Sequence, residues 1–139
     1  MLALRLASLT PIAHALLRIV AGAMFAQHGA QKLFGALGGT VMPVGSQLWI
    51  GAVIELVGGA LIALGLFTRP SAFVASGTMA VAYFQFHWKL HLGTAVFPAV
   101  NKGELAVLYC FVFLVFACTG AGKWGLDGVL IARDRGFRG

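Results

Sequence analysis

The sequence predicts an all-α protein: an integral membrane four-helix bundle with both termini in the cytoplasm and a short C-terminal interfacial helix. The composition is 60% hydrophobic and only 10% charged, whereas a soluble domain carries about a quarter charged residues. The apolar residues also gather into four long segments separated by short polar or glycine-rich breaks. Helices are expected because a spanning segment in lipid must satisfy its own backbone hydrogen bonds. The length suits one domain, residues 1–139.

The four predicted spans lie close to the length of about 20 residues that a membrane requires. The second and third are separated at Thr68-Arg69-Pro70, because proline cannot continue the preceding helix. An alternative for the first span is a cleaved signal peptide, since Ala21-Gly22-Ala23 has the small-x-small form of a cleavage site. Arg18 interrupts the apolar stretch just before it and argues against cleavage. The predicted spans cover residues 12–34, 48–67, 70–86 and 104–118.

The basic residues are divided unequally between the two sides of such a bundle. With four spans, both termini and the turn at residues 68–70 share one side. That side carries Arg5, Arg69, Lys123, Arg133, Arg135 and Arg138, and the other carries Lys32, Lys89 and Lys102. The positive-inside rule places the richer side in the cytoplasm and loops 35–47 and 87–103 outside. The expected partner is the lipid bilayer and not nucleic acid, because these charges are scattered at span ends.

Glu55 lies in the middle of the second span and is the most unusual residue of the chain. A carboxylate in the bilayer is costly unless it is paired, protonated or exposed to a polar cavity. Gly51, Gly58 and Gly65 share its helix face. Small residues let helices approach closely in lipid, so this face should point into the bundle. Glycine-rich faces would also allow a homodimer.

A depth argument places other polar residues near Glu55. Glu55 is seven residues from Leu48 and His28 is six residues from Phe34. At 1.5 Å per residue, both lie roughly 10 Å below the same side of the membrane. Lys32 lies one helical turn above His28. The sequence therefore predicts a small polar pocket that opens outward.

His87 ends the third span on this side and Glu104 begins the fourth. In the predicted pocket, Glu55 and His28 would handle protons. Lys32, His87 and Glu104 would bind a ligand, with a quinone head group as one candidate cofactor. An alternative ligand is a metal, for which His87 and His91 stand at i, i+4. A third interpretation is a purely structural hydrogen-bond network that fixes helix packing.

Three further charged residues are given structural roles: Arg18, Arg69 and Asp127. Arg18 lies about 9 Å from the inner end of the first span. We expect its side chain to snorkel to the inner interface, although it could instead pair with Asp127 if the tail folds back. Asp127 can cap a short apolar helix at the interface.

Four segments resemble the DoxX family of small membrane proteins: residues 25–34 (FAQHGAQKLF), 55–69 (ELVGGALIALGLFTR), 101–109 (NKGELAVLY) and 120–127 (GAGKWGLD). The resemblance extends over about residues 12–130. There are two departures at the exit turn, where Ala121 replaces a usual proline and Gly125 a common serine. The candidate functional positions that match the motifs of this family are His28, Lys32, Glu55, Arg69, Glu104 and Asp127, and His87 is matched less closely.

The resemblance implies a multi-pass protein of the bacterial inner membrane. Some relatives are subunits of thiosulfate:quinone oxidoreductases or associate with terminal oxidases. The expected function is therefore a subunit or accessory of a quinone-linked redox complex, with a protein partner. Whether this chain is itself an enzyme stays open. The alternative is a non-catalytic membrane protein that recruits or assembles another protein. A transporter is less favoured, because the sequence has no inverted repeat.

Overall fold

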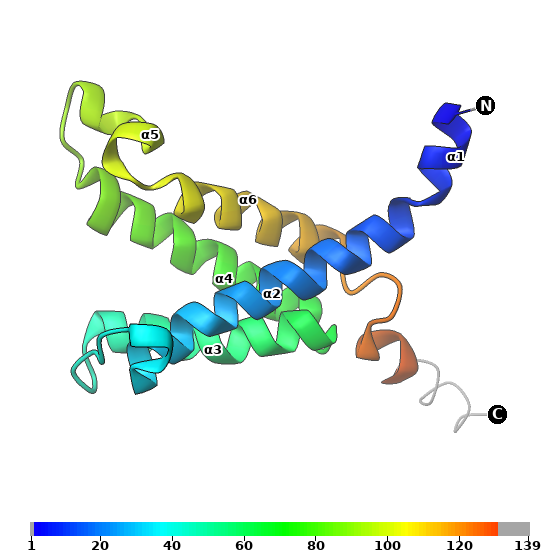
Figure 1. The fold of residues 1–139 in the computed structure, drawn as a ribbon, viewed down its shortest axis with the longest axis horizontal. Coiled ribbons are helices and arrows are strands. Elements are labelled where there is room, and N and C mark those ends of the chain that lie inside the picture. Colours follow the sequence, from blue (N-terminus) through cyan, green and yellow to red (C-terminus); the bar gives the residue numbers. More distant parts are fainter. Residues whose placement is uncertain (1, 131–139) are drawn as a thin grey trace.

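The computed structural model describes residues 2–130, which are helical throughout apart from turns and loops (Figure 1). Within this range there is no strand, so the all-α prediction is confirmed. The short elements are α1 (Leu2–Ser8), η1 (Ala36–Gly38), η3 (Thr94–Val96) and α5 (Pro98–Asn101). The long ones are α2 (Thr10–Phe34), α3 (Gln47–Leu64), α4 (Thr68–Ala82) with its π-helical extension η2 (Tyr83–Trp88), and α6 (Glu104–Thr119).

The long helices pack as two pairs. α2 lies against α3, α4 lies against α6, and contact between α3 and α4 joins the pairs. Figure 1 shows α1 and residues 120–130 at one end of the molecule. The loops at residues 35–46 and 89–103 lie at the other end. We call these the tail end and the loop end.

Glycine brings α2 and α3 into close backbone contact. A Cβ atom on Gly59 would lie 2.5 Å from the Ala26 nitrogen, and one on Gly22 would lie 2.6 Å from the Ala63 nitrogen. No real side chain tolerates such a separation from a neighbouring backbone. The glycines on this face are therefore required for the helix approach, as expected of packing in lipid.

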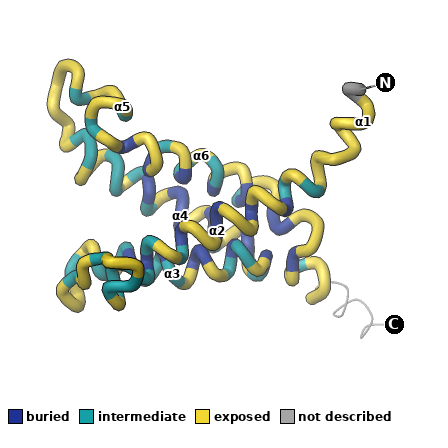
Figure 2. The backbone as a smooth tube through the Cα atoms, viewed as in Figure 1, coloured by how far each residue is buried: buried dark blue, intermediate teal, exposed yellow. Residues whose placement is uncertain are grey.

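Aromatic side chains link the two pairs. Phe25 of α2 contacts Phe113 and Tyr109 of α6, with ring centroids 4.7 and 5.5 Å apart. Outside this thin core, many large apolar residues are exposed, and Figure 2 shows exposed residues along the long helices. Phe73 and Phe111, for example, are 68% and 62% exposed. An apolar surface of this extent indicates contact with lipid or another protein.

Helix lengths and boundaries differ in detail from the predicted spans. Of the helices in residues 2–130, only α3 is both long and apolar enough to cross a membrane by itself, and the apolar α6 is shorter. The chain reverses at Gly65 and Phe67, which adopt left-handed φ angles of 69° and 47°. The predicted break at 68–70 thus falls inside the first turn of α4. Pro70 is tolerated there because that turn has no use for its N–H.

Gly59→Ala and Gly51→Ala make a matched test of the α2–α3 contact. Both glycines are in α3, but a Cβ on Gly51 meets nothing within 4 Å. We expect Gly59→Ala to lower the free energy of unfolding by about 1–3 kcal/mol through overpacking. Gly51→Ala should leave it unchanged or raise it by up to about 1 kcal/mol, because alanine favours helix. Denaturant unfolding in detergent measures both, and equal effects would contradict the close contact.

Candidate functional site

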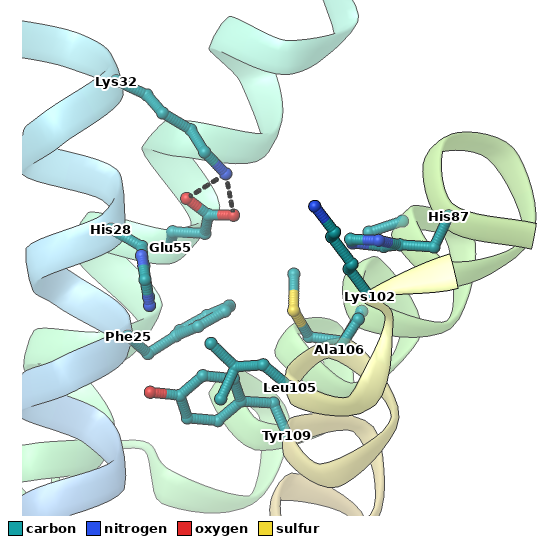
Figure 3. A pocket seen from close by; sticks show the side chains of 11 residues that line it. Phe25, His28, Lys32, Glu55, His87, Lys102, Leu105, Ala106 and Tyr109 are labelled. Atoms are coloured by element: carbon teal, nitrogen blue, oxygen red, sulfur yellow. Dashed lines mark hydrogen bonds and ion pairs between the residues drawn. The ribbon is translucent and has the colours of Figure 1, made fainter. Parts of the chain in front are cut away.

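A cavity of about 230 Å³ opens toward the loop end, where α2, α3, α4 and α6 converge (Figure 3). Its apolar wall includes Phe25, Met79 and Leu105. The ionisable side chains around it are His28, Lys32, Glu55, His87, Lys102 and Tyr109. The structure therefore brings together four of the site residues predicted from sequence: His28, Lys32, Glu55 and His87.

An ion pair between α2 and α3 forms one side of the cavity. Lys32 Nζ lies 2.6 and 2.8 Å from the two carboxylate oxygens of Glu55. Glu55 is 3% exposed, whereas the Lys32 side chain is 35% exposed. The pair meets because Gly29, one turn before Lys32, packs against the backbone of Leu56. Each carboxylate oxygen retains a lone pair with which it could accept a further hydrogen bond.

The other polar groups come from α2, the π-helix and the start of α6. His28 is half-buried, and its ring meets that of Tyr109 edge-on at 6.3 Å. His87 lies in the π-helix η2, with Nδ1 3.3 Å from the backbone oxygen of Asn101. Lys102 enters from the opposite side to Lys32 (Figure 3). Two lysines facing one glutamate make the site suitable for a ligand that carries acceptor oxygens.

Tyr109 is a site residue that the sequence analysis missed. It is 5% exposed, and its hydroxyl finds no hydrogen-bond partner within residues 2–130. Tyr109 lines the cavity, but its hydroxyl is buried and points toward α2, away from the space between Lys32 and Lys102 (Figure 3). The available signal was composition, because Tyr109 is the only tyrosine in the apolar segment 104–118.

Glu104 and His91 lie apart from this cavity. Glu104 is exposed in the first turn of α6, where its charge complements the helix dipole. Glu104 is two residues before Ala106, which lines the cavity. At 3.6 residues per turn, the Glu104 side chain is rotated about 200° around the helix from that of Ala106. His91 is exposed and lies beyond the end of η2, because Lys89 and Leu90 have left-handed φ angles. His87 and His91 therefore do not share a helix face, as the predicted metal site would require. No cluster of three metal-ligating side chains occurs in the described part of the chain.

Arg18 does not snorkel, contrary to the sequence prediction. Its side chain is fully buried, and Nη1 donates to the carbonyl oxygens of Ile62 at 2.7 Å and Ala63 at 2.6 Å. Nη2 lies 3.3 Å from the carbonyl oxygen of Trp124. These acceptors are two carbonyls from the last turn of α3 and one from the tail, and the carbonyl of Ile62 also accepts from the Gly65 amide. The buried charge is thus met by backbone oxygens within the protein.

Arg69 and Asp127 complete a group of charged helix caps at the tail end. Arg69 donates to the carbonyl oxygens of Cys118 and Ala117 at the end of α6. Asp127 accepts from the amides of Phe67 at 2.7 Å and Thr68 at 2.9 Å, where α4 begins. Cations therefore sit at helix C-termini and an anion at an N-terminus, as the helix dipole favours.

The pKa of the Asp127 carboxyl group is lowered by its surroundings. Burial pushes its pKa upward, but the hydrogen bonds from the Thr68 and Phe67 amides and the charge of Arg18 act in the opposite direction. The net result is a pKa below the ordinary value for aspartate. The folded protein therefore favours the ionised form.

Comparison with known proteins bears on this arrangement. The DoxX family model matches residues 13–88, which include His28, Lys32, Glu55, Arg69 and His87. The chain belongs to the DoxX family. No solved structure matches it significantly.

Two relatives of this DoxX protein match over most of their length. An "Uncharacterized protein" of Haemophilus influenzae is 44% identical over 117 residues, covering 81% of this chain and 87% of the relative. The "Putative oxidoreductase CatD" of Bacillus subtilis is 30% identical over 118 residues, covering 81% and 82%. Family membership identifies the protein without assigning its chemistry.

Lys32→Met should destabilise the protein more than Glu55→Gln. Loss of Lys32 leaves a buried carboxylate without its cation, which costs about 3–5 kcal/mol. Loss of the carboxylate leaves a lysine that is exposed enough to be hydrated, so we expect a cost of roughly 1 kcal/mol. Denaturant unfolding in detergent gives both values. Equal losses, or a larger loss for Glu55→Gln, would show that the burial difference has no energetic effect.

Asp127 should make stability depend on pH. Its lowered pKa means that its contribution is complete at neutral pH and is lost as the pH falls through the folded-state pKa. Asp127→Asn keeps an acceptor for the amides but removes the charge, so we expect a loss of roughly 0.5–1 kcal/mol at neutral pH. The difference from wild type should shrink in acid. Melting temperatures between neutral and acidic pH test this, and a constant difference would contradict it.

Proposed function

We propose that this DoxX protein is a multi-pass subunit or accessory of a quinone-linked redox system in the bacterial inner membrane. Its cavity at the loop end would bind the quinone head group. The observation that carries this proposal is a buried Lys32–Glu55 ion pair that opens onto a cavity with further donors. Lys102 has no ion-pair partner among residues 2–130, and the imidazole rings of His28 and His87 line the same cavity. Quinone carbonyl oxygens would accept from such donors.

The proton chemistry follows from the same side chains. Reduction of a quinone takes up two electrons and two protons, and oxidation of the quinol releases them. Glu55 would accept a hydrogen bond and then a proton from a quinol hydroxyl, with His28 as a second proton carrier. The electrons would come from or go to a redox protein partner. The name of the Bacillus subtilis relative is in keeping with a redox role.

A membrane location accounts for the outward apolar side chains of the long helices. It also suits the charge distribution, since the positive-inside rule applied to the whole sequence assigns the tail end to the cytoplasm. Both termini would then be cytoplasmic and the cavity would open outward. Residues 126–130 form a helical turn that would lie at the interface, with Leu126 and Val129 exposed.

A second candidate function is recruitment of another protein without catalysis. The observation that favours it is apolar exposure in the loops. Leu92 is 94% exposed, Val44 83% and Leu37 76%. These residues lie outside the predicted spans, where lipid would not cover them. A protein partner that docks on the loop end would account for them, and a redox complex would need the same contact.

Glu55→Gln and Glu104→Gln test the proton-handling role with a matched pair of acids. In the purified full-length chain, we expect Glu55→Gln to weaken binding of a tail-less benzoquinol by about tenfold, because a charge-assisted hydrogen bond is lost. Affinity for the oxidised benzoquinone should change less than about twofold, since it has no proton to give. Glu104→Gln, outside the cavity, should change neither. Unchanged quinol affinity in Glu55→Gln would remove Glu55 from proton handling.

A further inference from the structure

A second cavity of about 160 Å³ adjoins the first between α3 and α4. Both cavities are lined by Lys32, Glu55, Met79, Ala82 and His87. The ion pair and one face of α4 therefore border both cavities, which places the second cavity directly beside the candidate site.

The remainder of the second cavity differs in character from the first. Its wall includes Leu48, Val81 and Phe86, which are at least 38% exposed on the outer surface. Gly51 also lines it, and a Cβ there would meet nothing within 4 Å. The space thus opens sideways between two helices toward the apolar surroundings. Its charged and imidazole side chains are all shared with the first cavity, and its other polar side chains are Gln47 and Thr78.

Size and chemistry together limit what can occupy the two spaces. Each cavity is smaller than the ~300 Å³ at which typical ligand pockets begin, and only the two combined exceed it. The first is lined by two lysines and two histidines. The part of the second that is not shared is mainly apolar, with a glycine gap, and also includes Gln47 and Thr78. A ligand that fills both must have a small polar head joined to an apolar extension.

We propose that the ligand is a lipid quinone whose head group occupies the first cavity and whose tail leaves through the second, between α3 and α4, into the bilayer. This inference rests on the function proposed above and adds the class of quinone and its route. The ion pair would lie at the junction of head and tail. The ligand could then enter from the membrane without passing through the loops.

Another apolar groove on the same pair of helices does not offer this route. It is lined by Val53, Val57, Gly58 and Val74 among others, and it has no residue in common with either cavity at Glu55. A tail lying there would not be continuous with a head group beside Lys32. It therefore serves as a comparison site.

The test fills the second cavity without touching the ion pair. Gly51→Leu places a side chain in the open gap, and Gly77→Leu is the control. Gly77 is exposed in α4, outside the cavities discussed here, and a Cβ there also meets nothing within 4 Å. Both changes favour helix, so folding should be preserved. Affinities of the full-length chain in nanodiscs are measured for a tail-less benzoquinone and for the same ring with a decyl tail.

We expect Gly51→Leu to lower the affinity for the decyl quinone by about tenfold or more. Its affinity for the tail-less quinone should fall by less than about twofold. Gly77→Leu should change neither affinity. If Gly51→Leu lowers the affinity for neither probe, or lowers both affinities equally, the proposed route of the tail is wrong while quinone binding stands. If the wild-type protein binds neither probe, the proposed function fails together with this inference.

Photolabelling gives a second test of the route. A photoreactive group at the end of the decyl tail should label Leu48, Val81 or Phe86. Labelling only at Val57 or Val74 would assign the tail to the comparison groove.

Discussion

The burial of Glu55 is the constraint on which the rest of the structure depends. A carboxylate that is almost fully removed from solvent in an apolar helix needs a cation at contact distance, and Lys32 supplies it. The two residues can meet only because glycines let α2 and α3 touch along their backbones. The close helix contact therefore serves the site as well as the packing. A polar centre is held between helices whose outer faces are apolar.

The tail end solves a related problem with different groups. The end of α3, the start of α4 and the end of α6 meet there, and helix termini carry carbonyl and amide groups without partners in their own helix, which are costly to bury unpaired. Arg18, Arg69 and Asp127 satisfy them, and residues 120–130 fold back to make this possible. The tail end is consequently fixed by charged caps, whereas the cavity and its less regular loops lie at the other end.

The helices and most of the cavity followed from the sequence because hydropathy and helical rise depend only on residue order. Counting residues from the span ends was enough to place His28 and Glu55 at one depth. Contacts between helices could not be read in this way. Tyr109 looked like one more apolar residue, and Glu104 appeared to belong to the site because only its depth, and not its direction, was considered. Arg18 was expected at the interface because the acceptors offered by α3 and the tail are visible only in three dimensions.

Native mass spectrometry of the untagged protein, extracted gently from its own membrane, tests the central claim most directly. The claim is that the cavity beside Lys32 and Glu55 holds a lipid quinone. The account predicts a bound mass that matches a lipid quinone of that membrane, with an occupancy that falls in Gly51→Leu and is unchanged in Gly77→Leu. A second protein subunit could accompany it. Recovery of the chain with a protein subunit and no small ligand would contradict the account and would favour a recruiting role, with the ion pair serving helix packing alone.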